Sequence, residues 1–263
     1  MPDNESEKSA ADNEASPTIT VTDLIARSFH LARSKYLSEN RAWIDLAGAL
    51  AGRSGILPLL MGVQRVGELD LVMRAMEDEF LARAAQDPFA SNYQLVFAET
   101  WVVACYEALR AFKQRDEERE KLAKKDGIQP ETDALSNTAD FKVVFRQFEL
   151  LRMPIAKYEV ASERKMDGES ILMRTVGEGP HREFLYTRSD PARFHIMPTV
   201  IGPNGRIGWY ATDHLNKQQQ TVWIERRVLS DKVLGLVQII EPAGLREARL
   251  KAEGAAQPSN KEA

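Results

Sequence analysis

The sequence has few of the residues from which covalent and metal-based sites are built. It contains one cysteine, Cys105, and four histidines, so no intrachain disulfide can form and a site made of several thiolates is excluded. No Gly-Lys-Ser or Gly-Lys-Thr phosphate loop, no Gly-x-Ser-x-Gly nucleophile motif and no His-Glu-x-x-His zinc motif occurs in the chain. We therefore expect no cofactor and no metal, and we favour a protein that is not an enzyme.

Long apolar runs and an excess of one charge are missing as well. Residues 95–112 form the most apolar helix-length segment, but Glu99, Glu107 and Arg110 are too many charges for a membrane span. Five acidic residues and one lysine in residues 1–17 account for the whole net charge of -4, so the remaining 246 residues are balanced. A balanced body exerts no long-range attraction on nucleic acid or on an anionic membrane. We therefore expect no membrane contact and disfavour nucleic acid as a partner.

The N-terminal residues 1–17 are polar and acidic. They lack the basic start and the apolar run of a secretory signal, so we expect a cytoplasmic protein. They also contain no large apolar residue beyond Met1, which predicts a disordered acidic tail. Its deletion is expected to leave stability unchanged, because it has little apolar surface to bury.

Beyond this tail, the apolar pattern changes once along the chain. Residues 18–166 carry helical periodicity, and residues 167–240 carry short apolar runs separated by turn residues. Residues 241–263 are expected to be weakly helical to disordered. Helices followed by strands, without alternation, predict an α+β fold: an N-terminal helical bundle, then a small antiparallel sheet packed on the helices. Whether the two regions form one domain or two stays open.

Apolar spacing predicts five helices in the first region, the fourth of them apolar nearly all round and therefore central to a bundle. Pro154 is expected to kink the last one. Residues 113–126 are mostly charged, which predicts a helix end in solvent. Residues 56–62 are apolar and irregular and could be a buried connector or a short strand. The five predicted helices cover residues 20–37, 41–50, 68–85, 92–113 and 138–163.

The clearest local signal in the second region is a β-hairpin at 199–212. Two strand-like runs, 199–201 and 206–212, flank the sequence Gly-Pro-Asn-Gly at 202–205, and Asn-Gly between two such runs is typical of a hairpin turn. The alternating segment 220–225 predicts a third strand, and residues 228–237 predict a short helix.

One group of charged residues lies on helix faces that are otherwise apolar. Glu107 and Arg110 are neighbours at i, i+3, and Arg152 and Glu159 are seven residues apart on the last predicted helix. Charges rarely enter such faces unless they are paired. The favoured interpretation is a buried ion-pair network, or charges that reach the surface; the alternative is a cleft that binds a ligand or RNA. The candidate binding cluster consists of Glu99, Tyr106, Glu107, Arg110, Arg152, Lys157, Tyr158 and Glu159.

The region around Arg152 also bears a family resemblance. A helical bundle with Arg-x(4–6)-His at the start of its last helix is the pattern of the HEPN group of RNA-cleaving and nucleotide-binding domains, and residues 68–165 resemble it. Lys157, Tyr158 and Glu159 occupy the positions where that histidine would fall. The resemblance implies a degenerate HEPN-like module associated with RNA or nucleotide binding, without the histidine that the family's nuclease chemistry uses.

Other chemistry-bearing residues have simpler explanations. Cys105 lies in the most apolar helix, which predicts a buried, inert thiol. His30, His195 and His214 have no metal-ligand spacing, although His214 beside Asp213 could form an acid–base pair. Aromatic and basic residues alternate in the predicted sheet and could stack on single-stranded nucleic acid, but a small core is the favoured interpretation. These residues are Trp209, Tyr210, Trp223, Arg206, Arg226 and Arg227.

Taken together, these observations favour a non-enzymatic protein that acts through protein contacts, as an interaction or scaffold module. The support is the balanced body and the lack of any catalytic or cofactor motif. The sequence does not identify the protein partner, and it leaves a homo-oligomer open.

Overall fold

The computed structural model describes residues 19–82, 89–127, 134–157, 170–174, 183–187, 199–202, 205–213 and 220–240. The tails expected at 1–17 and 241–263 lie outside these ranges, and so do His195 and His214. His30 is described and is exposed on the first helix.

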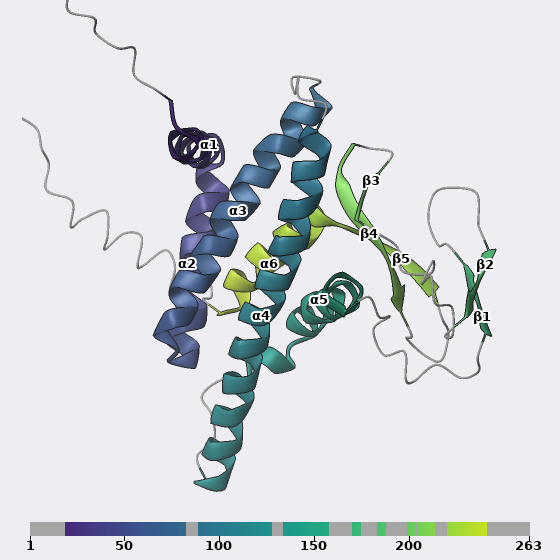
Figure 1. The fold of residues 1–263 in the computed structure, drawn as a ribbon. Coiled ribbons are helices and arrows are strands. Elements are labelled where there is room, and N and C mark those ends of the chain that lie inside the picture. The colour runs from purple at the N-terminus through teal and green to yellow at the C-terminus, as the bar shows by residue number, and fades with distance from the viewer. Residues whose placement is uncertain are drawn as a thin grey trace, which may run out of the picture.

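The fold is α+β, with an N-terminal helical region followed by a small three-stranded antiparallel sheet, β3-β4-β5, and a separate antiparallel pair, β1-β2 (Figure 1). Helices α3 and α4 run side by side through the bundle, and the sheet lies on one side of it next to α5. The helices are α1 (Val21–Lys35), α2 (Leu37–Ser54), α3 (Leu57–Leu81), α4 (Ala90–Lys125), α5 (Ala139–Lys157) and α6 (Arg226–Ile240), with a 3-10 turn, η1 (Leu135–Asn137). The strands are β1 (Ser170–Arg174), β2 (Glu183–Thr187), β3 (Val200–Ile201), β4 (Ile207–Asp213) and β5 (Gln220–Glu225).

The start of α1 follows the sequence signal. The Thr20 side chain accepts a hydrogen bond from the backbone N–H of Asp23, and the Asp23 carboxylate accepts one from the backbone N–H of Thr20. This reciprocal capping box satisfies two N–H groups that the first helical turn leaves free. Thr20 is therefore the N-cap of α1.

The segment at 56–62 is neither a connector nor a strand. It forms the first turns of α3, which begins at Leu57 with Pro58 in its first turn. Proline is tolerated there, because the N–H that it lacks has no partner inside the helix and its fixed φ suits helical geometry. The chain reverses just before this point at Gly55, whose φ of 71° ends α2.

Helix α4 is the central helix, as its apolar composition predicts. Ala98, Trp101 and Val102 are fully buried in it. The helix continues to Lys125 through the charged segment, where ion pairs at i, i+4 such as Lys113–Glu117 at 2.8 Å support it. The expected helix end in solvent is therefore confirmed.

Helix α5 contains Pro154 and continues as a helix to Lys157. The rest of the predicted helix, to residue 163, lies outside the described residues.

The hairpin at 199–212 is confirmed. Strand β3 pairs antiparallel with β4, and β4 pairs antiparallel with β5, with Trp209 opposite Ile224 and Tyr210 opposite Trp223. Gly205, with a φ of 72°, lies in the turn. Gly208 leaves space for the indole of Trp223, since a Cβ atom at this position would lie 2.2 Å from that ring.

Helices and sheet contribute to one hydrophobic core. Trp101 of α4 and Phe148 of α5 have ring centroids 5.5 Å apart. Ile207, Trp209 and Ile224 of the sheet belong to the same cluster of buried side chains. The face of the sheet that bears Trp209 is therefore covered by the helices.

Candidate functional site

Four residues of the predicted polar cluster come together where α4 and α5 pack. The guanidinium of Arg110 donates to the Glu107 carboxylate at 2.7 Å, and a nitrogen of Arg152 lies 3.6 Å from the other oxygen of Glu107. The guanidinium of Arg152 also lies over the ring of Tyr106, 5.2 Å from its centroid. These four residues form the Arg152 cluster.

The remaining four residues of the prediction are not part of this cluster. Glu99 accepts a hydrogen bond of 2.7 Å from the hydroxyl of Thr199, and so links α4 to the start of the hairpin. Lys157 is exposed at the end of α5. Tyr158 and Glu159 lie outside the described residues.

The Arg152 cluster lies at the surface. The side chain of Glu107 is 40% exposed, that of Arg110 is 43% exposed and that of Arg152 is 25% exposed. Of the interpretations that the sequence allows, this arrangement corresponds to charges that reach solvent. Water screens such ion pairs, so they contribute little to stability.

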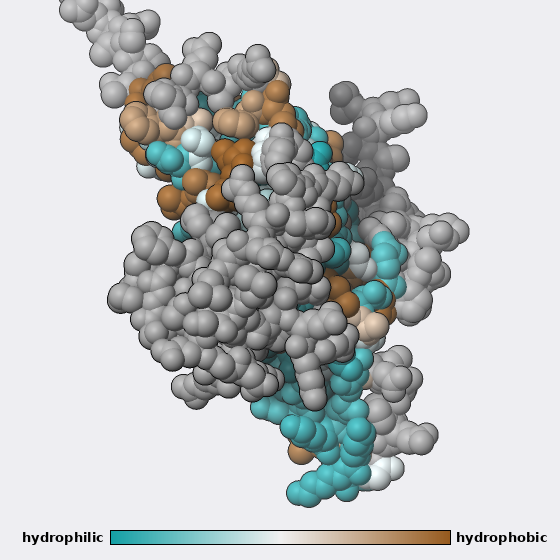
Figure 2. Space-filling model, turned by 90° about the vertical axis from the view of Figure 1, so that its right-hand side faces the viewer, coloured by the Kyte–Doolittle hydropathy of each residue, from teal (hydrophilic) through white to brown (hydrophobic). Residues whose placement is uncertain are grey.

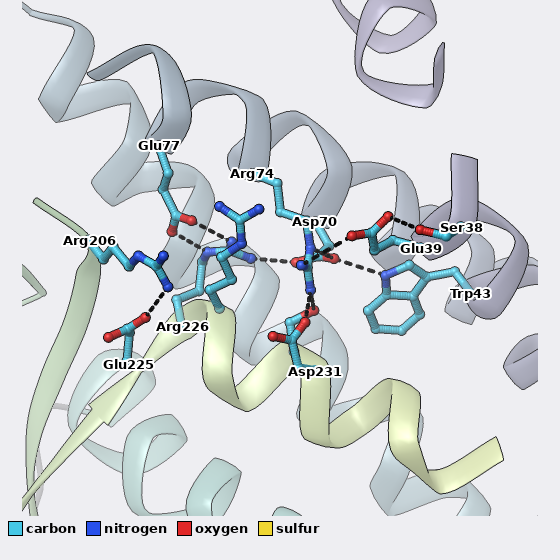
Figure 3. A network of polar contacts seen from close by, with 12 residues as sticks. Ser38, Glu39, Trp43, Asp70, Arg74, Glu77, Arg206, Glu225, Arg226 and Asp231 are labelled. Atoms are coloured by element: carbon cyan, nitrogen blue, oxygen red, sulfur yellow. Dashed lines mark hydrogen bonds and ion pairs between the residues drawn. The ribbon is translucent and has the colours of Figure 1, made fainter. Parts of the chain in front are cut away.

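A buried ion network does exist, but between α3 and α6 (Figure 3). Arg226 of α6 donates two parallel hydrogen bonds to the Glu77 carboxylate, at 2.6 and 2.8 Å, and also bonds to Asp70. Arg74 donates to Asp70 at 2.8 Å, and the indole N–H of Trp43 donates to the same carboxylate at 3.0 Å. The side chains of Asp70, Glu77 and Arg226 are 0% exposed, and that of Arg74 is 2% exposed. These four charged residues are the buried ion network.

The partners in the buried ion network favour the charged forms of Asp70, Arg74 and Arg226. Burial alone would raise the pKa of Asp70, but Arg226 and Arg74 lower it below its ordinary value. Burial opposes the charge on Arg226, and its bonds to Glu77 and Asp70 nevertheless raise its pKa. The two arginines balance the charge of the two carboxylates. Each arginine donates a hydrogen bond to at least one of these carboxylates, and each carboxylate accepts at least one. Every charged group of the network has a bonded partner, and the network links α6 to α3.

Sequence reasoning missed this network, although part of its signal was present. Asp70, Arg74 and Glu77 follow one another at i, i+4 and i+7 within the apolar periodicity of the helix predicted at 68–85. The same spacing argument was applied to Arg152 and Glu159. The fourth residue, Arg226, is 149 positions beyond Glu77 in the sequence, and no local pattern connects the two.

A second ion cluster joins the end of α1 to α3 and α6. Asp78 accepts hydrogen bonds from the Tyr36 hydroxyl at 2.5 Å and from Arg227 at 2.6 Å, and the ammonium of Lys35 lies 3.3 Å away. Burial raises the pKa of Asp78, but these donors outweigh it and lower the pKa to about 2. Asp78 therefore stays ionised in the folded protein to well below neutral pH.

Four of the basic and aromatic residues of the predicted sheet are engaged within the protein. Trp209 is buried, and Arg226 belongs to the buried ion network. Arg206 lies 3.0 Å from Glu225, and Arg227 is bound to Asp78. All three arginines thus have carboxylate partners, as the interpretation of these residues as a small core and its edges predicts.

Cys105 is buried, as predicted, with 3% of its surface exposed. Burial raises the pKa of its thiol well above the ordinary value, so the thiol is not a nucleophile at neutral pH. Within the described residues no group of three or more His, Cys, Asp or Glu could hold a metal ion. None of the helices described has the length and apolar character to span a membrane.

An apolar surface lies on the outer side of α4. Phe89, Tyr93, Val96 and Phe97 are 59, 52, 60 and 38% exposed. Their spacing places them on one face of the helix, opposite the face on which Ala98 is buried. We call these four residues the α4 stripe. Sequence analysis did not single them out, because a helix that is apolar nearly all round gives no sign of which face is left uncovered.

The α4 stripe leads into the Arg152 cluster. Glu107 is eleven residues, or about three turns, beyond Val96 and so lies on the same face of α4. The two surfaces differ in character, apolar at one end and charged at the other. On the face seen in Figure 2, most of the brown apolar side chains gather in the upper part, and the lower end, where α4 projects, is teal.

Comparison with known proteins gives no match: no family model, no curated protein and no solved structure is similar to the chain.

Proposed function

We propose that the protein is a non-enzymatic interaction module, and that the α4 stripe is the surface with which it binds a protein partner. The observation that carries this proposal is the exposure of four large apolar side chains, 38–60% each, in a row on one helix face. Single exposed apolar residues are ordinary, but a contiguous row of them is typical of an interaction site.

The surroundings of the α4 stripe support a protein partner. Aromatic residues are enriched at the centres of protein interfaces, and charged residues at their rims. The aromatic centre would be formed here by Phe89, Tyr93 and Phe97. The charged rim would be formed by Glu107 and Arg152. A partner that presents an amphipathic helix would fit, because its apolar face could lie along the row.

A role without catalysis is supported by the state of the ionisable groups. The buried ion network is balanced and fully bonded, and the Cys105 thiol is buried with a raised pKa. Catalytic groups are usually poised to change protonation state near neutral pH, and these are not.

The experiment compares two charge substitutions on otherwise unchanged protein. Val96→Glu places a carboxylate in the middle of the α4 stripe, whereas Val143→Glu places one at a position on α5 that is 53% exposed and outside the stripe. A protein partner is captured with the wild-type protein, purified, and titrated against all three forms. We expect at least tenfold weaker binding to Val96→Glu and unchanged binding to Val143→Glu. Equal affinity for the two variants would rule out the α4 stripe as the binding surface.

A second candidate function is RNA or nucleotide binding at the Arg152 cluster, the role that the HEPN resemblance implies. The observation in its favour is the guanidinium of Arg152 stacked on Tyr106 at the surface, since single-stranded nucleic acids bind to aromatic and arginine planes. Glu107 beside them repels phosphate and speaks against it. A mobility-shift titration with short RNA, compared between wild type and Arg152→Met, distinguishes this function from the first.

A further inference from the structure

Helix α1 projects from the bundle as an arm. Every residue from 19 to 28 is exposed, and within the helix only Ala32 is buried. The arm is held at its C-terminal end, where Arg33 pairs with Glu68 at 2.5 Å and Lys35 pairs with Asp78. In the described part of the chain, no other element packs over the first two turns of the arm closely enough to bury them.

The arm is apolar along one side. Val21, Leu24, Ile25 and Leu31 are 73, 53, 53 and 72% exposed and lie within one arc of the helix. A helix of 15 residues is marginally stable in water without tertiary contacts, even when it is capped as this one is at Thr20. An amphipathic arm of this kind gains most by packing its apolar side on another surface.

The α4 stripe has the length and the apolar character to receive the arm. Val21 to Leu31 spans about 15 Å of helix, and Phe89 to Phe97 spans about 12 Å, at 1.5 Å per residue. Between Ala90 and Tyr106 the only charged residue of α4 is Glu99. Between Val21 and Leu31 the arm carries one acidic and one basic residue, Asp23 and Arg27, so its charges balance. An arm without net charge thus matches an apolar surface that is nearly free of charge.

The arm does not cover the α4 stripe of its own chain. Helix α1 packs on α3, and α4 packs on the other side of α3 (Figure 1). The stripe itself is exposed while the arm is in place. Any arm that covers the stripe has to come from a second molecule.

We propose that the α4 stripe binds the α1 arm of a second copy of this chain, and that two such reciprocal contacts form a symmetric dimer. This inference rests on the proposed function and names its partner. Each of the eight side chains would bury on the order of 100 Å². Two contacts would then remove roughly 1,600 Å² from water, which is the size of a standard stable interface. One contact alone would bury about half of that and fall below the stable range.

The test measures the mass in solution of the full chain and of three variants. Leu24→Glu alters the arm, Val96→Glu alters the α4 stripe, and Val143→Glu is the control on α5. All three positions are more than half exposed, so a glutamate can reach water without disturbing the fold. We expect a dimer for wild type and for Val143→Glu, and a monomer for the other two. Circular dichroism of each variant checks that it is folded.

A mixing experiment then identifies which surfaces meet. Leu24→Glu keeps an intact stripe, and Val96→Glu keeps an intact arm. In the reciprocal dimer, a mixture of the two restores one complete contact. Differently tagged copies should therefore associate measurably but more weakly than wild type, whereas neither variant associates alone. If the arms instead paired with each other, the stripe variant would remain a dimer and mixing would restore nothing.

The outcomes separate this inference from the proposed function. A wild-type monomer at concentrations of tens of micromolar overturns the dimer. The α4 stripe then still stands as a binding surface if Val96→Glu loses a captured partner. A dimer that persists in Val96→Glu also overturns the inference, and unchanged partner capture by the same variant overturns the proposed function as well.

Discussion

At the scale of single residues, Arg226 makes the contacts on which the fold depends most. It is fully buried, and its guanidinium bonds to Glu77 and Asp70, two carboxylates that no water reaches. Buried ion pairs are costly to break one-sidedly, because the remaining charge stays in a low-dielectric environment.

We predict that Arg226→Met lowers the free energy of unfolding by about 3–5 kcal/mol, since it leaves Glu77 and Asp70 with Arg74 as their only buried cation. Adding Glu77→Gln should recover part of this loss. The control is Arg152→Met, whose partner Glu107 is 40% exposed, for which we expect about 1 kcal/mol or less. Urea denaturation of the three proteins measures the differences. Equal losses for Arg226→Met and Arg152→Met would contradict the assignment of the network.

Asp78 makes stability depend on pH in the acidic range. Its folded pKa of about 2 lies below the ordinary 3.8, so the ionised form stabilises the folded state. This contribution is complete above about pH 4 and is lost as the pH falls toward 2. We predict that Asp78→Asn is less stable than wild type at neutral pH but loses less stability between pH 4 and 2. Thermal melts across this range test the prediction, with its exposed neighbour Glu79→Gln as the control, which should follow the wild type.

The sequence predicts some contacts between charged residues and not others. Spacing identified Glu107 and Arg110 as neighbours on one helix, because helical periodicity determines which side chains share a face. It could not tell that this face is open to water, since exposure depends on what packs there. Arg226 could not be assigned at all from sequence, because its partners are brought to it only by the tertiary fold.

At the scale of elements, α2 and α3 approach closely at Gly67. A Cβ atom at this position would lie 2.5 Å from Cγ of Trp43, whose indole bonds to Asp70. Glycine is therefore required by the packing of the two helices rather than by backbone conformation.

We predict opposite effects for two glycine substitutions in the same helix. Gly67→Ala should destabilise by about 1–3 kcal/mol, because Trp43 has to move within a packed core. Gly62→Ala meets nothing within 4 Å and should stabilise by up to about 1 kcal/mol through helix propensity. Thermal or urea denaturation of both variants gives the comparison. A stabilised Gly67→Ala would mean that α2 and α3 do not pack this closely.

The elements were predictable where one signal dominates. The helix at 68–85 and the hairpin at 199–212 follow from periodicity and from the Asn-Gly turn. The predicted start of this helix at residue 68 was wrong. Residues 56–62 look irregular because they contain Pro58, but a proline in the first turn is compatible with a helix. Sequence periodicity does not distinguish a proline that begins a helix from one that ends it.

At the scale of the whole molecule, the sheet shares its core with the helices. Trp209 and Ile224 are buried in the same cluster as Trp101 and Phe148. We predict that the two regions unfold together as one cooperative unit. Hydrogen exchange followed by mass spectrometry, at increasing urea, should show peptides from β4 and from α4 converging on one opening reaction. Two separate midpoints would instead identify two domains.

Because Cys105 is buried, the rate at which its thiol is alkylated can measure how often the core opens. The thiol is the only one in the chain, and the void beside it is about 10 Å³, far too small for an alkylating reagent. Because its raised pKa also keeps it protonated, labelling should proceed only when α4 separates from its neighbours. We predict that the labelling rate is very slow in the native protein, rises with urea, and is faster in Arg226→Met at the same urea concentration. Mass spectrometry of labelled protein over time would then measure how often the core opens, with no probe added to the sequence.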